Sequence, residues 1–317
     1  MKKNYLYFAV LVVTFLLAGL CRGSTKADDP NQLPPYRFVT SDPCFVDNYP
    51  RFSPDGKTLL FCRSVVKKRA WELYIVPITG GKASRFVRMS LPVLPSRPSW
   101  SSRTGLVAFT GADRVKAGVW LIESDGSAPR ALAIDGLSNR AFYPSWYPDG
   151  RKLAIVDYGH SVIKQIDIEK HTARALTDPN EFFAGQPSVS PDGMSIAFAG
   201  QRKQGKRYDQ SRNRIFLLDH HGATRELDPE SGRNPSWSPR GDWIAFRSNR
   251  GSDKGLSAIF VASPRGGTAR QLTSYELGAH HPSWSPDGKY IAFPARLPNG
   301  KDAAGIAILE VPTLVRH

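Results

Sequence analysis

Short apolar runs separated by polar turns cover most of this chain, and no stretch keeps a sustained helical period. A typical unit is "HPSWSPDGKYIAF", which begins one residue before Pro282 and ends at Phe293. Proline presets the second position of a β-turn, aspartate tolerates the third and glycine ends it, so "SPDG" predicts a tight turn between two strands. The pattern therefore predicts an all-β protein built from short strands.

The same unit occurs six times, with successive prolines 43 to 48 residues apart. The copies are "YPRFSPDGKTLLF", "RPSWSSRTGLVAF", "YPSWYPDGRKLAI", "QPSVSPDGMSIAF", "NPSWSPRGDWIAF" and "HPSWSPDGKYIAF". Their prolines are Pro50, Pro98, Pro144, Pro187, Pro235 and Pro282. So regular a period indicates a repeat protein.

Each copy predicts four strands. The turn joins the first two, a third follows a polar gap, as in "ELYIV" (72–76), and a short fourth follows a glycine-containing turn, as in "RALT" (174–177) or "RQLT" (270–273). Four antiparallel strands repeated at this period predict a six-bladed β-propeller of four-stranded antiparallel blades. We expect the tryptophans two residues after the repeat proline to pack between neighbouring blades; they are Trp100, Trp146, Trp237 and Trp284.

The sixth copy reaches its third strand, "GIAILEV", with only six residues left in the chain. The string "RFVT" (37–40) matches "RALT" and "RQLT", so we predict that this N-terminal strand completes the last blade and removes an exposed sheet edge. The alternative is that "TLVR" (313–316), near the C-terminus, supplies the strand.

The first residues predict a secretory signal peptide, residues 1–27. A basic start precedes the apolar run Leu6–Leu20, which is shorter than a membrane-spanning helix requires, and candidate cleavage positions follow Gly23 and Ala27. The protein is therefore expected to be periplasmic or secreted. A short N-terminal segment, 28–35, then precedes the propeller, 36–317.

Cysteine chemistry leaves two questions open. Lipidation at Cys21 would attach the protein to a membrane, but Leu20 stands where lipoprotein signals need a small residue, so membrane association is expected only if that lipidation occurs. Cys44 and Cys62 remain in the mature chain. In an exported protein they can form a disulfide, and alternatively Cys62 is a small buried hydrophobe.

The six copies resemble the repeats of the TolB-type propeller family, which carry "P-x-W-S-P-D-G-x-x-I-A-F". The resemblance covers about residues 36–312 and implies a six-bladed propeller, export to the periplasm and protein contacts. Three copies depart from the pattern: "SSRTG" replaces a turn, Val189 replaces a tryptophan and Arg240 replaces an aspartate. The α/β domain that precedes the propeller in TolB proteins has no counterpart in residues 28–40, so a role as a Tol-system subunit is not expected.

Similar repeats occur in prolyl-oligopeptidase-type enzymes and in oligogalacturonate lyases. A serine peptidase of that type needs a hydrolase domain with a G-x-S-x-G motif, and the nearest string, "GHSVI" (159–163), lacks the second glycine. Neither H-E-x-x-H nor CxxC occurs. We therefore expect no catalytic, cofactor or metal residues, with a lyase-like metal site as a minor alternative. The candidate ligands of such a site are His160, His280 and His281, which blade connectivity would place on one face. The same connectivity would place His171, His220 and His221 on the opposite face.

A partner-binding surface is predicted on that first face. The residues just before the repeat prolines are large, polar and varied, as in a recognition surface around the mouth of the central channel, although they could also be solvated loop ends. They are Tyr49, Arg97, Tyr143, Gln186, Asn234 and His281, and the neighbouring His280 joins them.

Charge supports this surface. The net charge is +15, and the predicted second-to-third-strand loops contain 17 Lys and Arg against 5 Asp and Glu. The densest loop is "QRKQGKRYDQSRNR" (201–214), from which Lys203, Lys206 and Arg207 are predicted to bind a partner. A positive face attracts anions. We expect an envelope protein or peptide, acidic in character, as the partner, with an anionic polysaccharide, bound or cleaved by a metal-dependent lyase, as the alternative. Because the protein is expected to be exported, nucleic acid is not expected as a partner.

Overall fold

The computed structural model separates the chain into two units, Met1–Gln32 and Leu33–His317, and most of the second unit is described. The described residues are 32–67, 70–87, 93–112, 117–205, 207–298 and 302–312. The expected signal peptide, its cleavage positions and Cys21 lie outside these ranges. Among the residues described, no helix is long and apolar enough to cross a membrane.

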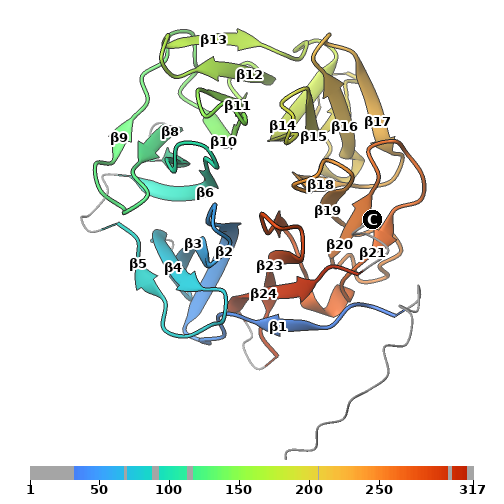
Figure 1. The fold of residues 1–317 in the computed structure, drawn as a ribbon. Coiled ribbons are helices and arrows are strands. Elements are labelled where there is room, and N and C mark those ends of the chain that lie inside the picture. Colours follow the sequence, from blue (N-terminus) through green and yellow to red (C-terminus); the bar gives the residue numbers. More distant parts are fainter. Residues whose placement is uncertain are drawn as a thin grey trace, which may run out of the picture. The chain divides into compact units, whose positions relative to one another are not determined.

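The all-β prediction is confirmed. The described chain contains strands β1 to β24 and two 3-10 turns, η1 (Gln210–Arg212) and η2 (Tyr275–Leu277). Figure 1 shows the sheets around a common centre, with strands such as β6, β10 and β14 innermost and β5, β9 and β13 outermost.

The second to fifth repeats each form a separate four-stranded antiparallel sheet. The second contains β6 (Leu94–Trp100), β7 (Val107–Ala112), β8 (Ala117–Ile122) and β9 (Arg130–Ala131). The third contains β10 (Ala141–Trp146), β11 (Lys152–Asp157), β12 (Val162–Asp167) and β13 (Thr172–Ala175). The fourth contains β14 (Phe182–Val189), β15 (Ser195–Arg202), β16 (Arg214–Asp219) and β17 (Thr224–Asp228). The fifth contains β18 (Arg233–Trp237), β19 (Ile244–Ser248), β20 (Ala258–Ala262) and β21 (Arg270–Gln271).

The first and sixth repeats share one eight-stranded sheet, so the expectation of six separate sheets needs correction. One antiparallel group contains β2 (Phe45–Phe52), β3 (Thr58–Val65), β4 (Glu72–Pro77) and β5 (Ser84–Arg85). The other contains β22 (Ser283–Trp284), β23 (Tyr290–Arg296), β24 (Ala304–Glu310) and β1 (Tyr36–Phe38). The two groups merge because Val46 of β2 makes one parallel bridge with Ala304 of β24.

The N-terminal strand occupies the outer edge of the sixth repeat, as predicted. β1 pairs antiparallel with β24, with Arg37 opposite Ile308. Beyond the strand, the Thr40 hydroxyl accepts a hydrogen bond of 2.8 Å from the Ile306 amide. Thr177 and Thr273, the last residues of "RALT" and "RQLT", accept the equivalent bonds from third-strand amides at 3.0 and 2.9 Å. The alternative strand, 313–316, lies outside the described residues.

A buried ion pair fixes this closing segment. Arg63 donates from Nε and Nη2 to the two carboxylate oxygens of Asp47, each at 2.7 Å, and both residues are buried. The Thr40 hydroxyl donates to the same carboxylate at 2.6 Å. Thr40 therefore connects the first repeat, through Asp47, to the sixth repeat, through Ile306.

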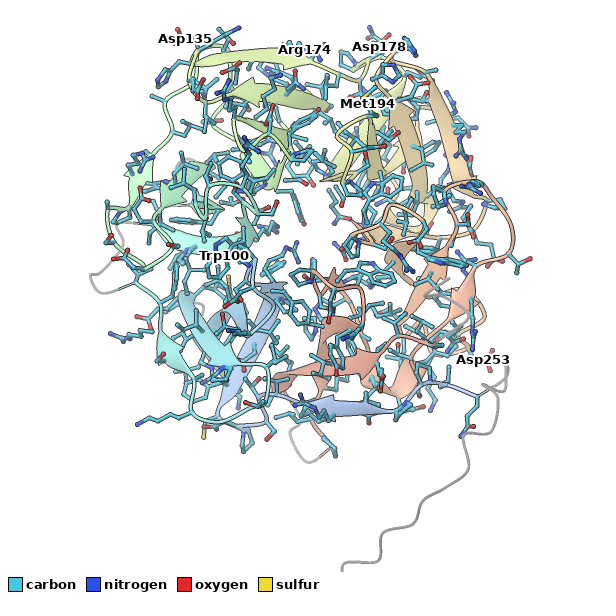
Figure 2. All side chains as sticks on the ribbon, viewed as in Figure 1. Trp100, Asp135, Arg174, Asp178, Met194 and Asp253 are labelled. Atoms are coloured by element: carbon cyan, nitrogen blue, oxygen red, sulfur yellow. The ribbon has the colours of Figure 1, made fainter. Side chains whose placement is uncertain are left out.

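The repeat tryptophans pack between neighbouring repeats, as predicted. Trp146, Trp237 and Trp284 each donate from the indole nitrogen to a carbonyl oxygen of the preceding repeat at 3.0 to 3.1 Å. Trp100 instead donates to Gly105 in its own repeat, where "SSRTG" forms the turn. Its ring still contacts Phe86 of the first repeat, with centroids 5.8 Å apart, and Figure 2 labels Trp100 at this boundary.

The two cysteines of the propeller are free thiols. Cys44 is exposed, whereas Cys62 is fully buried in the cluster between the first and second repeats. Burial raises the pKa of the Cys62 thiol to about 12. The structure therefore supports the buried-hydrophobe interpretation of Cys62 and not the disulfide.

Candidate binding face

The six residues that precede the repeat prolines share one unusual backbone conformation. Their φ angles lie between 46° and 57°, in the left-handed region that residues other than glycine rarely adopt. In five repeats the strand register shifts at this position, which marks a β-bulge in the first strand. A bulge redirects the side chain it carries. The repeated backbone therefore presents one redirected side chain per repeat.

We call these six residues the central ring; five of their side chains contact one another across the repeats, and Asn234 joins them through its backbone amide. The Arg97 guanidinium lies over the rings of Tyr49 and Tyr143, at 5.2 and 4.2 Å from their centroids. Tyr49 also meets the His281 ring, with centroids 4.4 Å apart. Their mutual contact across repeats places them at the centre of the molecule.

The other half of the central ring is joined by hydrogen bonds through Gln186. Its Nε2 donates to the Tyr143 hydroxyl at 3.3 Å, and its Oε1 accepts from the backbone N–H of Asn234 at 2.9 Å. All six residues are buried or partly buried. Partial burial and contacts between repeats distinguish these residues from freely solvated loop ends.

Burial disfavours the charged forms of two residues of the central ring, Tyr49 and His281. It raises the pKa of Tyr49 to about 12 and lowers the pKa of His281 well below its ordinary value, with His280 and Arg97 adding to the second effect. The pKa of His280 falls to about 4, again mainly through burial. Arg97 Nε and His281 Nδ1 are buried without a hydrogen-bond partner. The centre thus combines a guanidinium with unsatisfied polar atoms.

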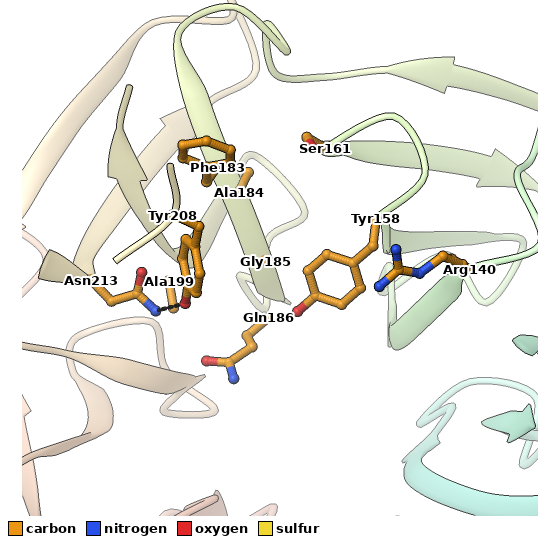
Figure 3. A pocket seen from close by; sticks show the side chains of 10 residues that line it. All are labelled: Arg140, Tyr158, Ser161, Phe183, Ala184, Gly185, Gln186, Ala199, Tyr208 and Asn213. Atoms are coloured by element: carbon orange, nitrogen blue, oxygen red, sulfur yellow. Dashed lines mark hydrogen bonds between the residues drawn. The ribbon is translucent and has the colours of Figure 1, made fainter. Parts of the chain in front are cut away.

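A pocket of about 360 Å³ adjoins the central ring between the third and fourth repeats (Figure 3). Tyr158 lines it from the third repeat and Tyr208 and Asn213 from the fourth, while Gln186 belongs to both the pocket and the central ring. Asn213 Nδ2 donates to the Tyr208 hydroxyl at 2.8 Å, and its Oδ1 is buried without a partner. The pocket therefore has an aromatic lining and an unsatisfied acceptor.

A second pocket, of about 440 Å³, lies between the fifth and sixth repeats. Its polar lining includes His280, Arg247, Arg296 and Asp302. His280 and His281 contact each other, with ring centroids 4.9 Å apart, so the pair links this pocket to the central ring.

The predicted basic loop borders the first pocket. Lys203 Nζ lies 4.5 Å from the ring centroid of Phe183, which lines that pocket, and Arg207 is exposed on the same loop. Lys206 lies outside the described residues. Sequence reasoning missed Tyr158, Tyr208, Arg247 and Arg296, which stand in loops or at strand ends where the six copies do not align. Their only signal was their position inside the basic loop windows.

His160 takes part in a separate polar cluster. Its Nδ1 lies 2.7 Å from a carboxylate oxygen of Asp157, which also accepts from Lys164 at 2.9 Å. Burial opposes ionisation of Asp157, but hydrogen bonds from Ser138, His160 and Lys164 hold its pKa well below the usual range. No contact joins His160 to His280 or His281 in the described structure. Within the same residues, no three His, Cys, Asp or Glu side chains are grouped to hold a metal.

Comparison with known proteins identifies a matching family and a curated relative. Residues 38–227 match the family described as the TolB beta propeller domain. The uncharacterized peptidase YuxL of Bacillus subtilis strain 168 is 29% identical over 158 residues, which are 47% of this chain but only 21% of that relative. The chain thus spans about a fifth of the length of this curated relative.

Solved structures with the same fold share less sequence. A protein assigned as TolB from Agrobacterium tumefaciens superposes with a TM-score of 0.64 at 20% identity, over 87% of this chain and 94% of the other. An oligogalacturonate lyase in complex with manganese gives a TM-score of 0.57 at 15% identity, over 90% and 95%. At such identities the likeness extends to the fold alone.

Proposed function

Because this chain belongs to the TolB β-propeller domain family, we propose that it is an exported, non-catalytic six-bladed propeller that binds a protein or peptide partner. The binding face contains the central ring, the two flanking pockets and the basic loop. The observation that carries the proposal is the central ring itself. One backbone position in every repeat presents a polar or aromatic residue, of five types in all, and these residues meet at the centre.

The chemistry of this face favours an acidic, extended partner. Arg97 and Lys203 supply positive charge beside aromatic rings, and such combinations are enriched where proteins meet. Aromatic pockets next to unsatisfied polar atoms are typical positions for the anchoring side chains of a partner. A peptide that crosses the central ring would reach both pockets.

The alternative function is action on an anionic glycan, either as a binding protein or as a lyase. The observation in its favour is the shared fold of the manganese-bound oligogalacturonate lyase. Against it, the three histidines considered as its ligands are divided between the His280–His281 pair and the Asp157-bound His160. Metal analysis of the purified protein, combined with absorbance of unsaturated products on oligogalacturonate, distinguishes the two. Stoichiometric metal together with turnover would favour the lyase.

The binding proposal is tested by crosslinking and capture from the native envelope. The triple variant Lys203→Glu, Lys206→Glu, Arg207→Glu reverses the basic loop and should capture less partner, with a weaker effect at high salt. A control variant places the same charge change on exposed turns at the opposite strand ends: Lys57→Glu, Lys170→Glu, Arg265→Glu. Equal capture by the two triple variants would count against the proposed face.

A further inference from the structure

The second pocket contains a cation that lacks a counter-ion. Arg247 is partly buried at the end of β19, and among the described residues no carboxylate pairs with it. Two other arginines of the same face differ: Arg63 and Arg250 form bidentate pairs with Asp47 and Asp228. A partly buried charge without such a partner is costly unless something else compensates it.

A second arginine increases this cost. Arg233 stands directly opposite Arg247 in the β18–β19 pair, and like charges in that position repel each other. Burial, followed by the charge of Arg233, lowers the pKa of Arg247. The fold therefore places two like charges opposite each other, and no described carboxylate forms an ion pair with Arg247.

The remaining lining supplies a second guanidinium and two acceptors. Arg296 lies against Gly278, where an added Cβ would stand 3.2 Å from Arg296 Nε, so the absence of a side chain makes room for this arginine. His280 Nδ1 lies 3.1 Å from the Gly278 carbonyl oxygen, which can only accept, so that nitrogen carries the proton and Nε2 is the acceptor. Asp302 also lines the pocket.

Charge and shape select the ligand. The lining has two arginines against one aspartate, and Arg233 adds a further positive charge opposite Arg247, so the pocket favours an anion. The planar fork of an arginine also fits a carboxylate. Beside Ser257 and two glycines, the rest of the lining is aliphatic, from Leu256, Ala295, Ala303 and Ala304, and suits the methylene stem of a side chain.

We propose that the pocket between the fifth and sixth repeats binds the carboxylate of a glutamate side chain of the peptide partner, with Arg247 and Arg296 as its donors. This inference rests on the proposed function and names one residue type that the partner contributes. It also assigns to Arg247 a ligand in place of the counter-ion that it lacks.

The test uses the full propeller and a capped pentapeptide of alternating alanine and glutamate, with binding measured by calorimetry. The same peptide with glutamine in place of glutamate should bind at least tenfold more weakly, as expected when a charged hydrogen bond is lost. Arg247→Gln and Arg296→Gln should each weaken binding of the glutamate peptide by a similar factor. The control Arg265→Gln, in the turn between β20 and β21 at the opposite strand ends, should bind like the wild type.

Thermal unfolding separates a binding effect from a folding effect. Without peptide, Arg247→Gln should melt no lower than the wild type, because no described carboxylate forms an ion pair with the arginine it removes. Equal affinity for the two peptides, or full binding by Arg247→Gln, would overturn the inference. So would tighter, Arg247-dependent binding of inorganic phosphate or trigalacturonate. If Arg247→Gln still captures the envelope partner while the basic-loop variant does not, only this inference fails and the proposed function stands.

Discussion

Replacing Gly305 by alanine should open the ring at its closure. Gly305 lies in β24 with an ordinary negative φ, so its backbone accepts alanine without strain. The difficulty is space, because the added Cβ would lie 2.0 Å from the Thr40 carbonyl oxygen and 3.0 Å from Leu297 Cδ2. A contact with backbone at that distance must push the closing segment away from β24.

The magnitude follows from the bonds at risk. Displacement of the segment endangers the bonds from the Val39 and Thr40 amides to the Ile306 carbonyl and the bond from the Ile306 amide to Thr40 Oγ1. At about 1 kcal/mol for each hydrogen bond, the loss is about 3 kcal/mol in the free energy of unfolding. For a domain of about 280 residues, with an unfolding entropy of about 2.1 cal/mol/K per residue, that corresponds to a fall of roughly 5 °C in Tm.

The assay is thermal unfolding followed by circular dichroism, with Gly118→Ala as the matched control. Gly118 is also a strand glycine, and an added Cβ there meets nothing within 4 Å. The control should melt within a degree or two of the wild type. If Gly305→Ala melted like Gly118→Ala, the closing segment would contribute little to stability and the account of the closure would be wrong.

Two further predictions concern buried charge. Asp47→Asn removes the carboxylate that Arg63 and Thr40 share. Because the change leaves a buried guanidinium unpaired, it should lower the free energy of unfolding by about 3 kcal/mol or more. An unchanged midpoint in urea unfolding would contradict this. His280 has a folded-state pKa of about 4 against an ordinary 6.5, so between these values the unfolded chain binds a proton that the folded chain does not. The free energy of unfolding should therefore fall as the pH drops from 6.5 toward 4. Because the pKa of His281 is also lowered by burial, His280→Gln should reduce this slope without abolishing it in urea titrations at several pH values.

Local chemistry was enough to predict the strands, the turns and the closing segment. "RFVT", "RALT" and "RQLT" could be aligned because each threonine accepts the same backbone hydrogen bond. The merged eight-stranded sheet could not be predicted. It depends on a single bridge between Val46 and Ala304, and no residue pattern around either position indicates that bridge.

The binding face was predicted only in part, for a similar reason. Repetition identified the six positions of the central ring, but not their left-handed backbone or their mutual contacts, which arise when the repeats come together. Tyr158, Tyr208 and Arg247 belong to loops or strand ends that differ between copies, and nothing in a single copy indicates that they line pockets. The absence of a counter-ion near Arg247 is visible only in three dimensions.

The pairing of β1 with β24 also delays closure of the last sheet until the end of synthesis. The Thr40–Ile306 bond joins residues 266 positions apart, so the ribosome makes one partner near the beginning and the other near the end. At a translation rate of 5 to 20 residues per second, the early strand waits about 13 to 53 s for its neighbour. During that interval its free edge is open to pairing with other nascent chains, and a cell would gain from a chaperone that covers it.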